Sequence, residues 1–112
     1  AWSTAMDDDA MASHWSRHMR AWDAEPRSLA DGILDDETYD WVADVVELRA
    51  THGRVVVANE NNVVRAAEMA RPITGIDVSP TGAAGLAGLL EVRDAFGADA
   101  RVVLAFSGVR RD

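Results

Sequence analysis

The stretch GRVVVANENNVVRAAEMAR, residues 53–71, predicts two elements in succession. Three consecutive valines before Asn59 are typical of a short strand buried on both faces, at residues 54–58. Asn59 can cap a helix over residues 60–71, because its side-chain oxygen accepts from the free N–H groups of the first turn. Pro72 is expected to end that helix. The stretch therefore indicates a buried strand followed by a helix.

The segment that follows repeats these two elements in the opposite order. Ser79 and Pro80 give the clearest helix start, a capping hydroxyl followed by proline at the first helical position, where no N–H is needed. We expect this helix over residues 80–96 and a second valine-rich strand over residues 101–106. The order strand, helix, helix, strand predicts an α/β fold with a parallel sheet covered by helices.

Upstream of residue 53 the sequence predicts two more helices. Residues 7–22 and 36–51 are the expected spans, joined by a loop that Pro26 and Gly32 mark. Gly53 is expected to end the second helix in the left-handed conformation. The first helix carries an apolar stripe at helical spacing, formed by Met11, Trp15, Met19 and Trp22.

Two strands are too few for a stable sheet. We therefore expect residues 1–112 to form a single partial domain, a piece of a larger α/β domain or a unit that oligomerises to complete itself. Residues 1–32 would be a helical arm and loop, and residues 33–112 the α/β segment.

Composition excludes several classes of function. The chain has 19 acidic and 11 basic residues, a net charge of −8 and no cysteine, and every basic residue is arginine. The negative charge argues against nucleic-acid binding. Without cysteine there are no disulfides, as is compatible with a cytoplasmic protein, and the longest apolar run, Gly82 to Leu90, is too short to cross a membrane. Without lysine, chemistry that needs a side-chain amine cannot be completed in these residues.

Some polar patterns have a simple structural interpretation. His14 and His18 stand four residues apart near three aspartates, but a further ligand is not evident, so we expect a surface pattern and no metal site. Asp7, Asp8 and Asp9 are expected to be a solvated helix start.

The small and aromatic residues allow similar alternatives. Gly82, Gly85 and Gly88 are expected to allow close packing rather than to bind phosphate. An anion site at the first turn of the helix, near Thr81, stays open. Trp15, Met19 and Trp22 are expected to be buried in a core against the missing parts of the larger domain, with partner binding as the alternative.

Three pieces of the sequence resemble the carboxy-terminal part of the fold-type II (tryptophan synthase β-like) pyridoxal-phosphate enzymes. VVVANENNVVRAAEMA is similar to their strand, polar cap and helix; TGIDVSPTGAAGLAGLL to their Pro-containing helix start; and RVVLAFSGVRRD to their final strand. GILDDETYDW, at residues 32–41, resembles threonine-synthase-like members best. Together the pieces cover about half of the chain.

The resemblance implies a fold, a cofactor and a site. The chain would be the carboxy-terminal fragment of a three-layer αβα large domain with short parallel strands. Ser107, with Gly108 beside it, matches the family position whose hydroxyl bonds the pyridine nitrogen of pyridoxal phosphate. A neutral hydroxyl leaves that nitrogen unprotonated and favours elimination and replacement reactions. Ser79 departs from the glutamate that is common in the family before the proline, which argues against a dehydratase or racemase.

The resemblance also implies partners. The cofactor-binding lysine and the glycine-rich phosphate cup of the family are absent here, so the missing N-terminal part of the parent enzyme would supply them. The parent would be a lyase or synthase acting on an amino acid or an O-phosphorylated amino acid, as a homo-oligomer. This chain alone would hold no catalytic residue and be inactive. The alternative is a non-catalytic interaction or oligomerisation module.

Overall fold

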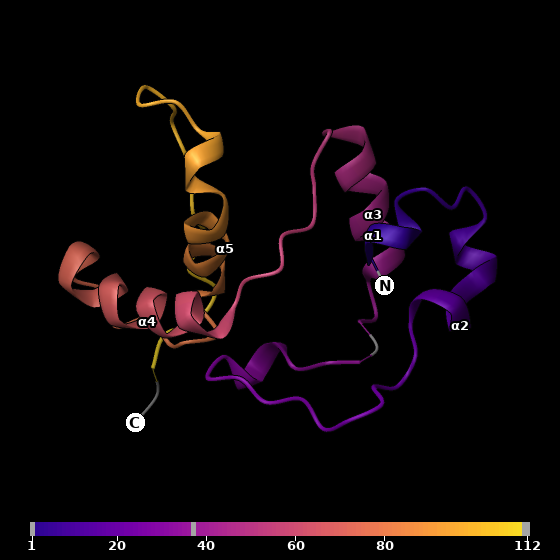
Figure 1. The fold of residues 1–112 in the computed structure, drawn as a ribbon, viewed down its shortest axis with the longest axis horizontal. Helices are drawn as coiled ribbons and strands as arrows, with labels where there is room; N and C mark the ends of the chain where they lie inside the picture. Colours follow the sequence, from indigo (N-terminus) through magenta and orange to yellow (C-terminus); the bar gives the residue numbers. More distant parts are fainter. Residues whose placement is uncertain (1, 37, 111–112) are drawn as a thin grey trace. The chain divides into compact units, whose positions relative to one another are not determined.

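The computed structural model describes residues 2–36 and 38–110, which belong to two compact units (Figure 1). The first unit comprises Ala1–Pro26 and Asp35–Val55, and the second comprises Arg27–Leu34 and Val56–Asp112. The first unit contains α1 (Trp2–Ala5), a 3-10 turn (Met11–His14), α2 (Trp15–His18) and α3 (Trp41–Ala50). The second contains a 3-10 turn (Asp31–Ile33), α4 (Glu60–Thr74), α5 (Ala84–Val92) and a further 3-10 turn (Arg93–Ala95).

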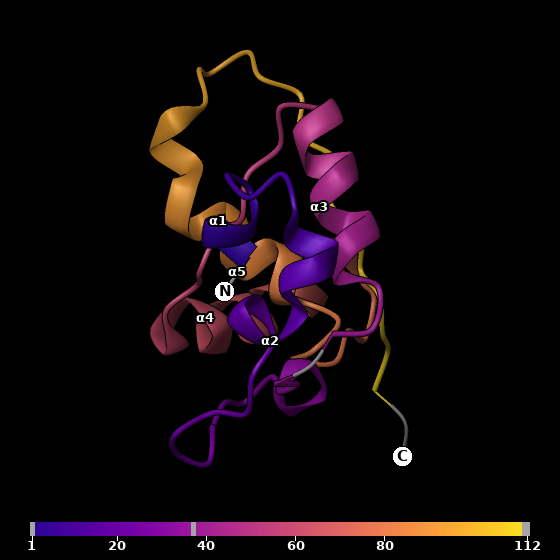
Figure 2. The ribbon, with the colours of Figure 1, turned by 90° about the vertical axis from the view of Figure 1, so that its right-hand side faces the viewer.

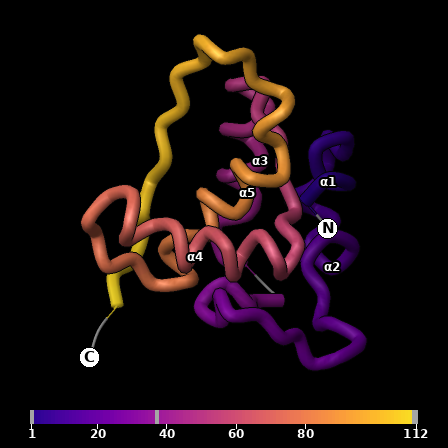
Figure 3. The backbone as a smooth tube through the Cα atoms, turned by 60° about the vertical axis from the view of Figure 1, so that its left-hand side comes forward, coloured from indigo at the N-terminus to yellow at the C-terminus, as the bar shows by residue number. Residues whose placement is uncertain are grey.

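The prediction of an α/β fold with parallel strands is wrong. Residues 54–58 and 101–106 are not strands, and among the described residues the β-structure is a single antiparallel bridge between Val78 and Val109. A strand exists only by pairing with a neighbouring strand, and neither valine-rich segment has such a neighbour within residues 2–36 and 38–110. One valine of each segment faces water, with Val57 84% and Val103 95% exposed, whereas Ala58 and Phe106 pack against the core of the second unit. Figure 3 shows the carboxy-terminal segment, residues 97–110, as an open, non-helical path.

The predicted helix over residues 7–22 is also wrong. Figure 2 shows the amino-terminal segment as short helical pieces joined by loops. The side chain of Asp8 accepts a hydrogen bond from the backbone N–H of Ala10 at 3.0 Å, and such local side-chain bonds compete with helix formation. The apolar stripe is divided as a result, because Met11 and Met19 are buried whereas Trp15 and Trp22 are 37% and 44% exposed.

The helix predicted over residues 36–51 starts later and ends differently. α3 begins at Trp41, and its left-handed terminal residue is His52, with φ of 54°, rather than Gly53. A Cβ on Gly53 would lie 2.6 Å from Leu48 Cδ2, so an added side chain would require the flexible end of the Leu48 side chain to move. Trp41 and Val45 are fully buried and form the core of this unit with Ala5, Met11 and Met19.

The predicted start of α4 is confirmed, and its predicted end is wrong. The Asn59 side chain accepts from the Asn62 backbone N–H at 3.0 Å and caps the helix. The helix then passes through Pro72 to Thr74 and ends at Gly75, whose φ is 75°. A proline removes one hydrogen bond near the end of a helix, and here the left-handed glycine terminates it.

α5 is shorter than the predicted span of residues 80–96. Ser79 acts as expected, because its hydroxyl accepts from the Gly82 N–H at 3.0 Å. The residues after Pro80 form turns, however, and regular helix runs only from Ala84 to Val92.

The core of the second unit consists mostly of small side chains. α4 and α5 cross each other in this unit (Figure 1), and small residues let two helices approach closely. The buried residues are Ala30, Val63, Ala66, Ala70, Val78, Ala83 and Ala87. No helix in the described ranges combines the length and apolar character needed to span a membrane.

Glu91 joins α5 to the start of α4. Its Oε1 accepts from the backbone N–H of Asn59 at 2.6 Å, from the Asn59 amide at 2.5 Å and from the Asn62 amide at 3.0 Å. The Asn59 N–H, followed by the Asn62 amide, holds the pKa of the Glu91 carboxyl below its ordinary value of 4.5. The ionised carboxylate therefore stabilises the folded state.

We expect the hydrogen bonds to the Glu91 carboxylate to make the free energy of unfolding depend on pH. Because folding lowers the Glu91 pKa, its contribution is complete above about pH 4.5 and is lost as the pH falls further. Glu91→Gln should lower the midpoint of urea unfolding at pH 7. It should also make the loss of stability between pH 7 and acidic pH smaller than in the unchanged chain. Glu68→Gln, at an exposed position of α4, is the control. Equal acid profiles for the two variants would contradict the assignment.

Candidate functional site

Two of the sequence motifs, 28 residues apart, meet in the second unit. Gly108 O accepts from the Ser79 backbone N–H at 3.0 Å and from the Ser79 hydroxyl at 3.3 Å. The Arg110 N–H donates to Asp77 O at 2.9 Å beside this contact. These bonds hold the carboxy-terminal segment against the turn that precedes α5.

The contact is so close that Gly82 admits no side chain. A Cβ on Gly82 would lie 2.1 Å from Gly108 O and 2.7 Å from Gly108 N. Gly85 has only an ordinary contact with Ala105 O at 3.6 Å, and Gly88 has nothing within 4 Å. The predicted close packing thus holds at Gly82 and not along the whole row of glycines.

Thr81, near which an anion site stayed open, is engaged with the loop before residue 34. Its hydroxyl oxygen accepts from the Gly32 N–H at 3.0 Å. Nearby, Glu60 accepts from the Leu29 N–H at 2.7 Å. Both bonds fix the loop to the helices of the second unit, so the Thr81 side chain has a structural partner.

Ser107 lies exposed at the end of the carboxy-terminal segment. Phe106 before it packs against the core of the second unit, and Gly108 after it is bonded to Ser79. Its neighbours are therefore held in place. In the described part of the chain no hydrogen bond engages the Ser107 hydroxyl, which leaves this hydroxyl accessible to a ligand.

The first unit contains a polar cluster that the sequence did not predict. Asp8 Oδ2 lies 2.7 Å from His18 Nε2 and 2.8 Å from His14 Nδ1. The other ring nitrogen of His18 lies 3.3 Å from the Thr4 hydroxyl. His18 is 2% exposed and Asp8 is mostly shielded, with 15% of its side chain exposed. The expectation of a solvated aspartate run is thus wrong for Asp8.

The charge of Asp8 is fixed by these partners. The hydrogen bond from His18, and then that from His14, holds the pKa of the Asp8 carboxyl well below its usual range. Both histidine nitrogens face the carboxylate at hydrogen-bond distance. Within residues 2–36 and 38–110, no group of three or more histidine, aspartate or glutamate side chains is arranged to hold a metal ion.

Arg49 is a second residue whose role the sequence did not reveal. Its guanidinium donates to the backbone carbonyls of Met6 at 2.9 Å, Ala5 at 2.9 Å and Asp8 at 3.0 Å. These bonds tie α3 to the loop that carries the polar cluster. The only signal in the sequence was a lone arginine near a helix end, which is common on surfaces.

Aromatic rings pack beside the cluster. The Trp41 ring lies 5.4 Å from Trp15, edge to face, and 5.6 Å from the His18 ring. The buried Trp41 indole nitrogen has no hydrogen-bond partner among the residues that the structure describes. The rings therefore provide an apolar wall on one side of His18.

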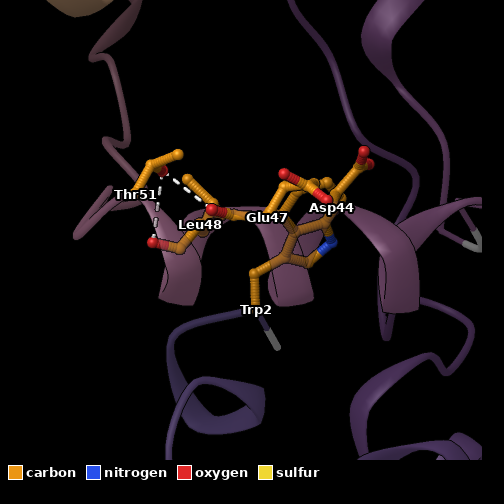
Figure 4. Close-up of a pocket in the computed structure, with 5 residues that line it drawn as sticks. All are labelled: Trp2, Asp44, Glu47, Leu48 and Thr51. Atoms are coloured by element: carbon orange, nitrogen blue, oxygen red, sulfur yellow. Dashed lines mark hydrogen bonds between the residues drawn. The ribbon is translucent and has the colours of Figure 1, made fainter.

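Each unit also has a hollow. In the first, about 340 Å³ lies between α1 and one face of α3, where the Trp2 indole reaches toward Asp44 and Glu47 (Figure 4). Thr51, at its edge, donates to Glu47 O at 2.7 Å. In the second, a hollow of about 440 Å³ lies beside residues 56–58 and the small residues of α5. Neither is lined by Ser107 or by the polar cluster.

No protein-family model matches the chain, and comparison with curated proteins and with solved structures finds no match.

We expect Gly82→Ala to break the contact with Gly108. The neighbouring atoms belong to the backbone and cannot rotate away, so the free energy of unfolding should fall by about 1–3 kcal/mol. Gly88→Ala, where the added Cβ meets nothing, should raise it by up to about 1 kcal/mol through helix propensity. Urea unfolding measures both; equal effects would refute the close approach.

A second comparison tests the polar cluster. Asp8→Asn should lower the thermal midpoint at neutral pH, because the amide cannot reproduce a charged acceptor for two imidazoles. Asp9→Asn is the matched control, since the Asp9 side chain is fully exposed and lies 3.7 Å from the Arg49 guanidinium. If Asp9→Asn is as destabilising as Asp8→Asn, the cluster does not stabilise this unit.

Proposed function

We propose that this chain is the carboxy-terminal segment of a pyridoxal-phosphate-dependent lyase or synthase, similar to threonine synthase. Its substrate would be an amino acid or an O-phosphorylated amino acid. One observation carries the proposal: the two glycine-containing motifs at Ser79–Gly82 and Ser107–Gly108, which the resemblance picks out, are in direct contact.

The residues at this contact fit one part of the cofactor. Ser107 presents an exposed hydroxyl, and a hydroxyl can donate to an unprotonated pyridine nitrogen. When bound, pyridoxal phosphate would supply an electron sink for the substrate's bonds. The residues that would hold its ring nitrogen are Ser107 and, through its backbone, Gly108.

The chain's own contribution is to position that hydroxyl. The bonds from Ser79 fix Gly108, and Phe106 is anchored in the core of the second unit. Ser107 lies between these two fixed points. Such preorganisation limits the conformational entropy lost when a ligand binds.

Other parts of the site must come from elsewhere. The chain contains no lysine, so a companion polypeptide or an upstream part of the enzyme supplies the amine and the phosphate-binding loop. Without that amine, the chain by itself would not carry out the pyridoxal-phosphate reaction. We place the complete enzyme in the cytoplasm as a homo-oligomer.

The test begins with the native transcript across the codon for Ala1. If the transcript encodes a polypeptide that carries the upstream lysine, this polypeptide is produced together with the chain. Binding of pyridoxal phosphate to the complex is then measured by absorbance. Ser107→Ala should weaken binding roughly threefold to tenfold, as expected for one hydrogen bond. Ser107→Thr should retain most of the affinity, because it keeps the hydroxyl.

Ser16→Ala is the control, an exposed serine of α2. Equal affinities of the Ser107→Ala and Ser16→Ala variants for pyridoxal phosphate would show that the Ser107 hydroxyl does not bind the cofactor. A transcript that encodes no lysine-bearing companion would contradict the whole proposal.

A non-catalytic interaction module is the second candidate. It is favoured by the exposure of Val57 and Val103 on segments that have no strand partner. Such segments can pair with another chain by strand addition. Sedimentation distinguishes the two, since a discrete dimer that is indifferent to pyridoxal phosphate would favour the module.

A further inference from the structure

A chain of hydrogen bonds in the first unit includes the hydroxyl of Thr4, an exposed residue. Thr4 Oγ1 lies 3.3 Å from His18 Nδ1, and His18 Nε2 lies 2.7 Å from Asp8 Oδ2. A hydroxyl, an imidazole and a carboxylate thus follow one another in the order that activates hydroxyl nucleophiles in acyl-transfer enzymes. These three residues have no part in the function proposed above.

The geometry assigns the proton on His18. Ionised Asp8 can only accept, so a neutral His18 carries its hydrogen on Nε2 and donates it to the carboxylate. Nδ1 is then an acceptor, and the Thr4 hydroxyl can donate to it. This tautomer satisfies both ring nitrogens of a residue that is 2% exposed, and it leaves Nδ1 able to take the Thr4 proton.

The surroundings support this arrangement. His18 packs against the Trp41 ring at 5.6 Å, which restricts its orientation, and His14 bonds the same Asp8 oxygen at 2.8 Å. Thr4 itself is an exposed residue, so it lies where a reagent can approach from solvent. The base is therefore shielded and oriented, whereas the nucleophile is accessible.

We propose that Thr4 is an acyl-acceptor site, with His18 as its general base and Asp8 as the positioning residue. Thr4 Oγ1 forms a bond to the carbonyl carbon of an activated ester while its proton passes to His18 Nδ1. The ester's C–O bond breaks, and the alcohol part leaves with the electron pair. His18 then releases the proton to water, so the products are an acylated threonine, an alkoxide or phenolate, and a proton.

The composition of the chain makes this proposal easy to test. Lysine and cysteine, the usual competitors for acyl donors, are both absent. With the amino terminus acetylated beforehand, the folded polypeptide of residues 1–112 is incubated with p-nitrophenyl acetate. Release of p-nitrophenolate gives the rate, and peptide mapping by mass spectrometry locates the acetyl group. Thr4 should be acetylated roughly 10²-fold faster than Thr51, whose hydroxyl donates to the backbone carbonyl of Glu47 rather than to an imidazole.

Four variants decide the outcome. Thr4→Ser should keep the fast phase, Thr4→Val should abolish it, and Thr51→Val should leave it unchanged. Thr4 is exposed, so its replacement should not unfold the chain, and circular dichroism checks this. His18→Gln should also abolish the fast phase if it folds. A fast phase that survives Thr4→Val, or equal acetylation of Thr4 and Thr51, overturns the proposal.

Discussion

The close approach of two backbone segments, at Gly82 and Gly108, is the constraint on which the second unit depends. A Cβ on Gly82 would overlap Gly108 O, so only glycine permits the contact. The bonds from Ser79 to Gly108 O depend on the same approach. Together they hold a segment that has no sheet to join, and they determine where Ser107 is presented.

Each unit is small, and polar contacts supplement its core. The core of the second unit is largely alanine, and alanine side chains bury little apolar area. Carboxylate bonds from Glu91 and Glu60 therefore help to hold its helices and loop together. In the first unit, Asp8 and Arg49 have the same role around the Trp41 core.

The exposed valines and the accessible serine have a common explanation in the proposed function. A segment that completes a larger enzyme would leave unpaired backbone and apolar side chains where the rest of that enzyme packs. Val103 and Ser107 lie on one such segment, the valine nearly fully exposed and the serine hydroxyl accessible. The absence of lysine is consistent with the same proposal, since another part of the enzyme would supply the amine.

The sequence by itself determined the features that act over a few residues. These are the capping of α4 by Asn59, the acceptor role of Ser79, and the exclusion of amine and thiol chemistry. Only the tertiary structure decided that residues 54–58 and 101–106 are not strands, that Asp8 binds two histidines, and that Gly82 meets Gly108. A cap forms with the next turn of its own helix, whereas a strand, a buried carboxylate or a close backbone contact exists only if a distant segment arrives. The spacing of apolar residues indicates which faces of a segment can be buried, but it does not indicate which distant segment will pack against them.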